Sequence, residues 1–287
     1  MTNAPRPTKN QRREEAREAA RVAREKALKR QKLLKWLIPT IASVAILAIV
    51  GGVVWAVIAF QPPPKKEAGP ANMISDGIVF EADGDGGVQY VPTAAIKKGG
   101  DPVPTEQREG LLNIVTYVDF SCPACKQFEE AYSASIQSMV AQGAATLEVK
   151  PIAILDYRGY TTDYSTRSNN VGACVANYAP ESFLDVMAAM YAQQPSEGGP
   201  GLGNNALVDV VKSAGLDNDD VNECITGESF QPWVSAATAR SSQAGVRSTP
   251  TIIINGTPWD RNAYGNFEDF VNAELAKLPV GDSAQSE

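Results

Sequence analysis

A long apolar run lies between residues 36 and 60 and contains no charged residue. As a helix it would extend about 37 Å at ~1.5 Å per residue, more than the ~30 Å hydrocarbon core of a bilayer. Trp36 and Trp55 lie toward its two ends, where indole side chains favour the membrane interface. The pattern predicts a single transmembrane helix, which the prolines that follow Gln61 do not continue.

Shorter apolar runs follow this segment and alternate between strand and helix patterns. Strands are predicted at residues 77–80, 88–91, 111–120, 145–155, 251–254 and 257–259, with Asn255-Gly256 as a strong hairpin signal. Helices are predicted from Pro123 to residue 139, across 165–245 with breaks near Pro180, 198–203 and Gly215, and over 266–278. This order predicts an α/β fold in which helices cover a small sheet and one helical segment is inserted.

The net charge of −7 is divided unevenly along the chain. Residues 1–35 hold twelve Lys or Arg and four Asp or Glu, a net charge of +8, whereas residues 61–287 carry a net charge of −15. Eight of the basic residues lie in 16–35, against Lys65 and Lys66 just after the apolar run. Because the basic side of a membrane helix stays in the cytoplasm, residues 61–287 are predicted to be exported.

The N-terminal part leaves alternatives open. A cleaved signal peptide is one, but the apolar run is longer than the usual apolar region and Phe60-Gln61-Pro62 is a poor cleavage site. The basic tail is interpreted as setting the topology, and it is suited to contact anionic lipid. Nucleic acid is not a predicted partner, because phosphate repels the acidic exported part and the tail has no supporting motif.

Four cysteines carry the candidate chemistry, and the chain contains no histidine. The lack of histidine excludes a Ser–His–Asp triad, a Cys–His pair and any His-ligated metal site. Cys122 and Cys125 form a Cys-x-x-Cys motif where a predicted strand gives way to a helix, with Pro123 at the first helical position. Free N–H groups and the helix dipole favour a thiolate at Cys122, and Cys125 lies on the same helix face.

This arrangement predicts thiol–disulfide exchange, in which Cys122 attacks and Cys125 closes the ring or resolves a mixed disulfide. Half of a zinc site and an inert structural disulfide are the other interpretations. A structural zinc site needs four ligands and the chain has no second Cys-x-x-Cys, so no metal is predicted.

The remaining cysteines, Cys174 and Cys224, both fall in the helical segment. In an oxidising compartment they are predicted to pair as a structural disulfide, which would restrict the unfolded chain by ~4 kcal/mol in the loop-entropy model. Sequence alone does not fix the connectivity, and a second redox centre is the alternative.

Three stretches together resemble a known family: YVDFSCPAC, STPTIIINGTPW and the helical segment between them, which contains DYSTRSNNVGACVANYAPESF. They are similar to the DsbA-like branch of the thioredoxin superfamily, and the helical stretch and basic N-terminus are similar to actinobacterial members. The resemblance covers about residues 75–280. It implies a thioredoxin fold with an inserted helical domain, preceded here by a single N-terminal transmembrane helix.

The predicted organisation has six parts. They are a basic cytoplasmic tail (1–35), a transmembrane anchor (36–60), a linker (61–75), a thioredoxin-like domain (76–160 and 245–280), an inserted helical domain (161–244) and a disordered tail (281–287).

The resemblance also implies a role for Thr249 and Pro250. It implies a cis peptide bond between them, in a loop that faces the two cysteines of the motif. The backbone at Thr249 would bind a substrate chain as an added strand. From the sequence alone, an ordinary trans bond is the alternative.

Departures from the family pattern concern three positions that tune the site. Ala124 stands where the best-known oxidases carry His, which predicts a less acidic Cys122. Thr116 stands where many members carry a buried acid, which leaves the proton-transfer group unassigned. Asp119 either serves as that group or, in the favoured interpretation, caps and solvates the turn.

The predicted function is that of an exported, membrane-anchored oxidase that introduces disulfides into cysteine-containing secreted proteins and has no bound cofactor. The resemblance implies a membrane partner that re-oxidises it, of the vitamin K epoxide reductase-like or DsbB-like kind. The missing cation at Ala124 keeps a reductase or isomerase as an alternative. A non-catalytic binding module on the same scaffold is a third hypothesis, which the intact Cys-Pro-x-Cys opposes.

Overall fold

The computed structural model describes residues 67–279, together with residues 21, 24, 26, 49 and 52. The predicted basic tail (1–35), membrane segment (36–60) and C-terminal tail (281–287) lie outside the described residues, apart from those five. In the described part, no helix has the length and apolar character needed to cross a membrane. The chain divides into two units, Met1–Pro63 and Pro64–Glu287, and the fold below is that of the second.

A six-stranded sheet forms the centre of this unit, in the order β2-β1-β4-β3-β5-β6. Its strands are β1 (Ile78–Ala82), β2 (Val88–Tyr90), β3 (Leu112–Val118), β4 (Ala145–Pro151), β5 (Thr251–Ile254) and β6 (Thr257–Pro258). Strands β3 and β4 pair in parallel, and the other neighbours pair antiparallel. Because β3 is central and covered by helices, its sequence is an almost continuous apolar run.

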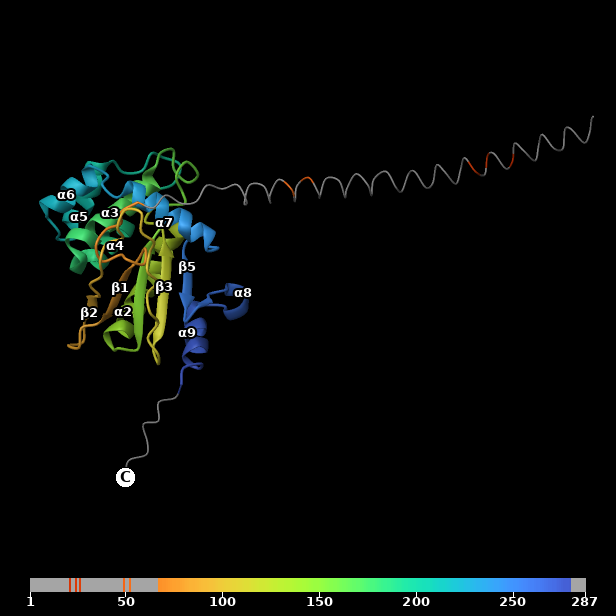
Figure 1. The fold of residues 1–287 in the computed structure, drawn as a ribbon, viewed down its shortest axis with the longest axis horizontal. Helices are drawn as coiled ribbons and strands as arrows, with labels where there is room; N and C mark the ends of the chain where they lie inside the picture. The colour runs from red at the N-terminus through yellow and green to blue at the C-terminus, as the bar shows by residue number, and fades with distance from the viewer. Residues whose placement is uncertain are drawn as a thin grey trace, which may run out of the picture. The chain divides into compact units, whose positions relative to one another are not determined.

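Helices surround the sheet, and several of them gather at one end of it. They are α2 (Pro123–Ala141), α3 (Tyr164–Tyr178), η1 (Pro180–Ser182), α4 (Phe183–Ala192), α5 (Asn204–Ser213), α6 (Asp219–Thr226), α7 (Gln231–Gln243), α8 (Arg261–Tyr264) and α9 (Phe267–Leu275). Figure 1 shows α3, α5 and α6 together beyond one end of the sheet, whereas α9 lies near the opposite end. The helical segment therefore stands over the end of β3 that leads into α2.

The predicted strand at 145–155 is too long, because β4 ends at Pro151. Ile152 N–H still donates to Val118 O, but the next two N–H groups donate to side chains. Ala153 N–H donates to Thr238 Oγ1 at 2.8 Å, and Ile154 N–H donates to Asp119 Oδ2 at 3.0 Å. The predicted helix at 266–278 is likewise shorter, with Asn266 as its N-cap and Leu275 as its last residue.

Part of the predicted linker is packed into the domain. Met73 is completely buried, Ala71 N–H donates to Asn177 Oδ1 and Asn72 Nδ2 donates to Ala176 O, both at 2.8 Å. These bonds hold Ala71 and Asn72 against the end of α3. The prediction that the linker extends to residue 75 is therefore wrong, because its last residues are part of the folded domain. The segment was interpreted as a linker because it is rich in small and polar residues, but it also contains the apolar Met73, which packs into the core.

A disulfide joins Cys174 of α3 to Cys224 of α6 across a sequence separation of 50 residues. Both residues are buried, and α3 itself is buried around almost its whole circumference. The bond therefore connects α3 to α6 within the core of the inserted segment.

Candidate functional site

The Cys-x-x-Cys motif lies where β3 ends and α2 begins. Cys122 is the N-cap of α2, with an extended backbone (φ −86°, ψ 121°), and Pro123 occupies the first turn. This position leaves the first N–H groups of α2 without partners inside the helix, and they point toward the Cys122 sulfur. Cys122 is 7% exposed and Cys125 is 1% exposed, so only the first sulfur reaches the surface. Both are free thiols.

Asp119 holds the two cysteines through its backbone. Its carbonyl accepts a hydrogen bond from Cys122 N–H at 2.9 Å, and its N–H donates to Cys125 Sγ at 3.5 Å. The Asp119 side chain is fully buried and accepts five hydrogen bonds: from Ser121 N and Oγ, Ser165 Oγ, Asn169 Nδ2 and Ile154 N. Asp119 caps the turn at Ser121 N, but it is fully buried and therefore does not solvate the turn as expected.

The loop at Thr249 and Pro250 is far from the motif in sequence but faces it in the structure. Their peptide bond is cis, and Cys122 Sγ lies 3.5 Å from Thr249 O, across 127 residues of chain. Thr249 is buried beside the motif, with 8% of its surface exposed. The structure therefore brings together the two motifs that the sequence places far apart.

The two sulfurs have opposite acidities. Hydrogen bonds from Cys125, from the Thr249 side chain and from the backbone N–H groups of Ala124 and Cys125 lower the pKa of Cys122 to about 6, against the opposing effect of burial. Burial, followed by the neighbouring Cys122, raises the pKa of Cys125 well above its ordinary value. Cys122 is therefore a thiolate at neutral pH, whereas Cys125 keeps its proton. Ala124 is exposed and supplies only its backbone.

Residues that sequence reasoning missed come from the inserted helical segment and from the loop just before it. Ser165 and Asn169, one turn apart on α3, both bond the Asp119 carboxylate. The Tyr160 hydroxyl donates to Ser121 O at 3.0 Å, and Gln194 Nε2 donates to Phe120 O at 2.9 Å. The only signal in the sequence is a polar pair spaced four residues apart in a helix with few charges. Its meaning depends on knowing that Asp119 lies opposite.

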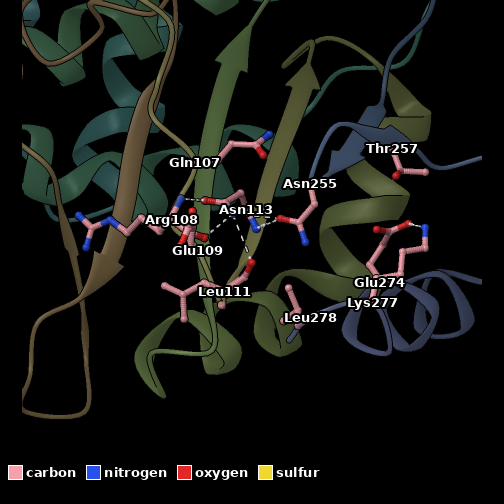
Figure 2. Close-up of a pocket in the computed structure, with 11 residues that line it drawn as sticks. Gln107, Arg108, Glu109, Leu111, Asn113, Asn255, Thr257, Glu274, Lys277 and Leu278 are labelled. Atoms are coloured by element: carbon pink, nitrogen blue, oxygen red, sulfur yellow. Dashed lines mark hydrogen bonds and ion pairs between the residues drawn. The ribbon is translucent and has the colours of Figure 1, made fainter. Parts of the chain in front are cut away.

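A hollow of about 340 Å³ lies away from the two cysteines. Figure 2 shows it near the beginning of β3, lined by Asn113, Asn255, Glu274 and Lys277. These side chains already pair with one another: Lys277 Nζ donates to Glu274 Oε1 at 2.6 Å, and Asn113 Nδ2 donates to Asn255 Oδ1 at 3.0 Å. Within the described residues, no group of three or more Cys, Asp or Glu is arranged to hold a metal ion.

Comparison with known proteins gives one family and several related structures. The sequence profile of the thioredoxin family matches residues 107–273, more than half of the chain. No curated protein sequence matches the chain.

Three solved structures illustrate the likeness. Reduced DsbA from Mycobacterium tuberculosis is 27% identical, with a TM-score of 0.47, over 57% of this chain and 88% of that chain. MdbA from Corynebacterium diphtheriae, a thiol-disulfide oxidoreductase, is 19% identical, with a TM-score of 0.48, over 69% and 93%. Oxidised BdbD from Bacillus subtilis is 17% identical, with a TM-score of 0.52, over 74% and 99%, and shares the fold.

Proposed function

Because the chain belongs to the thioredoxin family, we propose that it is a DsbA-like thiol–disulfide oxidoreductase whose working sulfurs are Cys122 and Cys125. The observation that carries this proposal is the contrast between the two sulfurs. Cys122 is a thiolate at a helix N-terminus with a pKa of about 6, and Cys125 is a buried thiol three residues away. A pair of this kind is suited to exchange, because one sulfur attacks or leaves easily and the other stays within reach.

The favoured direction is oxidation of substrate thiols. A substrate thiolate attacks Cys122 Sγ of the oxidised pair, the bond between the two sulfurs breaks, and Cys125 leaves with the electron pair. A second substrate thiolate then attacks the substrate sulfur of the mixed disulfide and releases Cys122 as a thiolate. A low pKa makes Cys122 a good leaving group, so the second step and the reduced enzyme are both favoured.

Thr249 is proposed to receive the substrate backbone. Its carbonyl lies 3.5 Å from Cys122 Sγ, so a peptide that presents a cysteine to Cys122 passes this residue. An extended substrate can add its backbone there as a short strand, which makes binding largely independent of the substrate's side chains. Such tolerance suits an enzyme with many substrates.

We place the enzyme outside the cytoplasm, anchored by residues 36–60. The length of that apolar segment, its lack of charge and the basic residues before it support this placement. The proposed substrates are cysteine-containing secreted proteins. The proposed oxidant of the reduced enzyme is a membrane redox partner, vitamin K epoxide reductase-like or DsbB-like.

The opposite direction, a reductase or isomerase, has one observation in its favour. Ala124 is exposed and places no cation between the cysteines, so the Cys122 thiolate depends on hydrogen bonds alone. Trapping of thiols in cells separates the two directions. A mostly oxidised pair supports the oxidase, and a mostly reduced pair supports the reductase.

The proposal is tested with the oxidised exported part (61–287) and a peptide that carries two thiols. Wild-type protein is expected to oxidise the peptide, and Cys122→Ser is expected to be inactive. Cys125→Ala is expected to accumulate secreted proteins as mixed disulfides on Cys122. A wild-type protein that exchanges no electrons with the peptide, or a Cys122→Ser protein that is as active as wild type, contradicts the proposal.

A further inference from the structure

Two buried carbonyl groups lie directly before Cys122, in the turn that follows β3. Phe120 and Ser121 are 1% and 0% exposed. Ser121 N–H donates to Asp119 Oδ1 and Cys122 N–H donates to Asp119 O, both at 2.9 Å. In a trans peptide unit the C=O points opposite to the N–H, so the carbonyl groups of Phe120 and Ser121 point away from Asp119. A buried carbonyl group without a donor is costly, so each of them needs a donor from elsewhere in the fold.

Side chains from the loop before α3 and from the segment after α4 supply these donors. Gln194 Nε2 donates to Phe120 O at 2.9 Å. The Tyr160 hydroxyl lies 3.0 Å from Ser121 O and 2.9 Å from Pro195 O, so its one proton is shared between two carbonyl groups. Within residues 67–279, the carbonyl groups of Phe120 and Ser121 have no other donor. We call Tyr160 and Gln194 the carbonyl clamp.

The clamp residues are fixed by their own surroundings. Tyr160 is 2% exposed, and its ring packs on the ring of Tyr164 with the centroids 4.7 Å apart. Gln194 lies two residues after the end of α4, and its backbone N–H donates to Tyr191 O at 3.2 Å. In the described part of the chain, neither clamp residue makes a hydrogen bond to a cysteine sulfur. The clamp therefore acts on Cys122 through the backbone that it holds.

The backbone before Cys122 decides which groups its sulfur meets. Cys122 is the N-cap of α2, and its sulfur accepts hydrogen bonds from the N–H groups of Ala124 and Cys125. The same sulfur lies 3.5 Å from Thr249 O, in the loop that faces the motif. Rotation of the peptide unit between Ser121 and Cys122 would change φ of Cys122 and move Sγ relative to these N–H groups. Because such donors favour the thiolate over the thiol, the backbone position controls how easily Cys122 is released as a thiolate.

We propose that Tyr160 and Gln194 are positioning residues for the exchange reaction: they hold the two carbonyl groups before Cys122 and thereby fix its sulfur against the first N–H groups of α2. This inference rests on the proposed function. In that reaction the substrate attacks Cys122 and later releases it as a thiolate, so a displaced sulfur is a poorer leaving group. The inserted segment and the loop before it thus assist the chemistry without a hydrogen bond to either sulfur of the motif.

The first test removes each clamp donor and titrates Cys122 in the reduced protein. Tyr160→Phe keeps the ring that packs on Tyr164 and removes the hydroxyl, and Gln194→Met keeps the length of the side chain and removes the amide. In each variant the pKa of Cys122 is expected to rise from about 6 to about 7, because the sulfur loses part of its contact with the N–H groups of α2. The thiolate absorbance in the ultraviolet, followed against pH, measures it.

Each clamp residue has a matched control next to it. Tyr164→Phe removes a buried hydroxyl that has no hydrogen-bond partner within the described residues. Gln193→Met removes an exposed amide that donates to Ser213 Oγ, away from the motif. Both controls are expected to titrate like wild type, so a shift confined to Tyr160→Phe and Gln194→Met is specific to the clamp.

The second test measures the redox equilibrium of the cysteine pair with glutathione. At pH 7 the equilibrium constant for oxidation of glutathione by the protein is expected to fall about fivefold in each clamp variant, since the Cys122 thiolate contributes less to the stability of the reduced form. A purely structural role would lower the free energy of unfolding of the oxidised and reduced forms alike. It would leave this constant and the titration of Cys122 unchanged.

The two variants are independent, so if one of them does not fold the other decides. A pKa of Cys122 that stays at about 6 in the clamp variants, beside a wild type that oxidises the peptide with two thiols, overturns the inference and leaves the proposed function standing. Equal shifts in the clamp variants and in Tyr164→Phe and Gln193→Met overturn it as well. A wild-type protein that does not react with the peptide at any pH overturns the proposed function and, with it, the inference.

Discussion

Cys122 and Cys125 occupy one turn of the same helix, and their surroundings shift their pKa values in opposite directions. Cys122 meets hydrogen-bond donors from α2 and from Thr249, and these outweigh the cost of burial. Cys125 lies deeper and has one backbone donor, from Asp119. The division of labour between attacking and resolving sulfur thus follows from which donors each sulfur can reach, with no cation beside either one in the motif.

Thr249→Val tests the contribution of the one side-chain hydroxyl near Cys122. Valine keeps the branched shape and removes the donor, so the pKa of Cys122 is expected to rise from about 6 toward its ordinary value of 9.0. The thiolate absorbance in the ultraviolet, followed against pH, measures this shift. Thr226→Val, which removes a hydroxyl from the exposed side of α6, is the control. An unchanged titration of Cys122 in Thr249→Val would show that backbone N–H groups suffice.

Asp119→Asn tests whether the buried carboxylate is an anchor. The groups that bond the carboxylate are hydroxyl and N–H donors. In the variant, the NH₂ group of Asn is also a donor, so it would face at least one of them without an acceptor between them. The free energy of unfolding is expected to fall by about 3 kcal/mol, as for a broken buried polar network. Urea unfolding measures it, with the exposed Asp185→Asn on α4 as control. Equal stability of the two variants would refute the anchor role.

At the scale of elements, apolar periodicity predicted most of the strands and helices. The runs that became β3 and β5 are central strands with few polar residues, and Asn255-Gly256 formed the tight turn that its residue types demand, both with positive φ. The errors lie where the backbone bonds to side chains. Ala153 and Ile154 look like the continuation of a strand, yet their N–H groups donate to Thr238 and Asp119, and no local sequence pattern predicts these bonds.

For the candidate site, too, the sequence predicted the distinctive local motifs but not the contacts between distant side chains. The two cysteines and the Thr249-Pro250 loop were found because their residue types and order are distinctive in the sequence. Ser165 and Asn169 were not found, because a polar residue on a buried helix face has a meaning only once its partner is known.

The disulfide between α3 and α6 gives a prediction at the same scale. Replacement of Cys174 and Cys224 by Ala, in a protein that carries Ser at 122 and 125, is expected to lower the free energy of unfolding by ~4 kcal/mol, since the bond closes a loop of about 50 residues. Urea unfolding with the 122 and 125 double variant as reference measures the loss. A change below about 1 kcal/mol would mean that contacts between the helices already restrict the unfolded chain.

At the scale of the whole molecule, redox state and stability are coupled through Cys122. In the folded reduced protein its pKa is about 6, below the ordinary value of 9.0, so between these values the unfolded chain holds more protons than the folded one. The stability of the reduced form therefore rises with pH across this window, and the gain is lost as pH falls through about 6. Cys125 has a raised pKa and opposes this trend only above 9.0, the ordinary pKa of a thiol.

The oxidised form has no thiol at either position, so it lacks this dependence. The reduced form is thus expected to gain stability over the oxidised form as pH rises from about 6 toward 9.0. Urea unfolding of both forms, below pH 6 and within the window, measures the difference. By the same thermodynamic cycle, a protein whose reduced form is the more stable one is an oxidant, because it readily transfers its disulfide to substrate thiols. A difference that is flat across the window would contradict both the low pKa of Cys122 and the oxidising direction that rests on it.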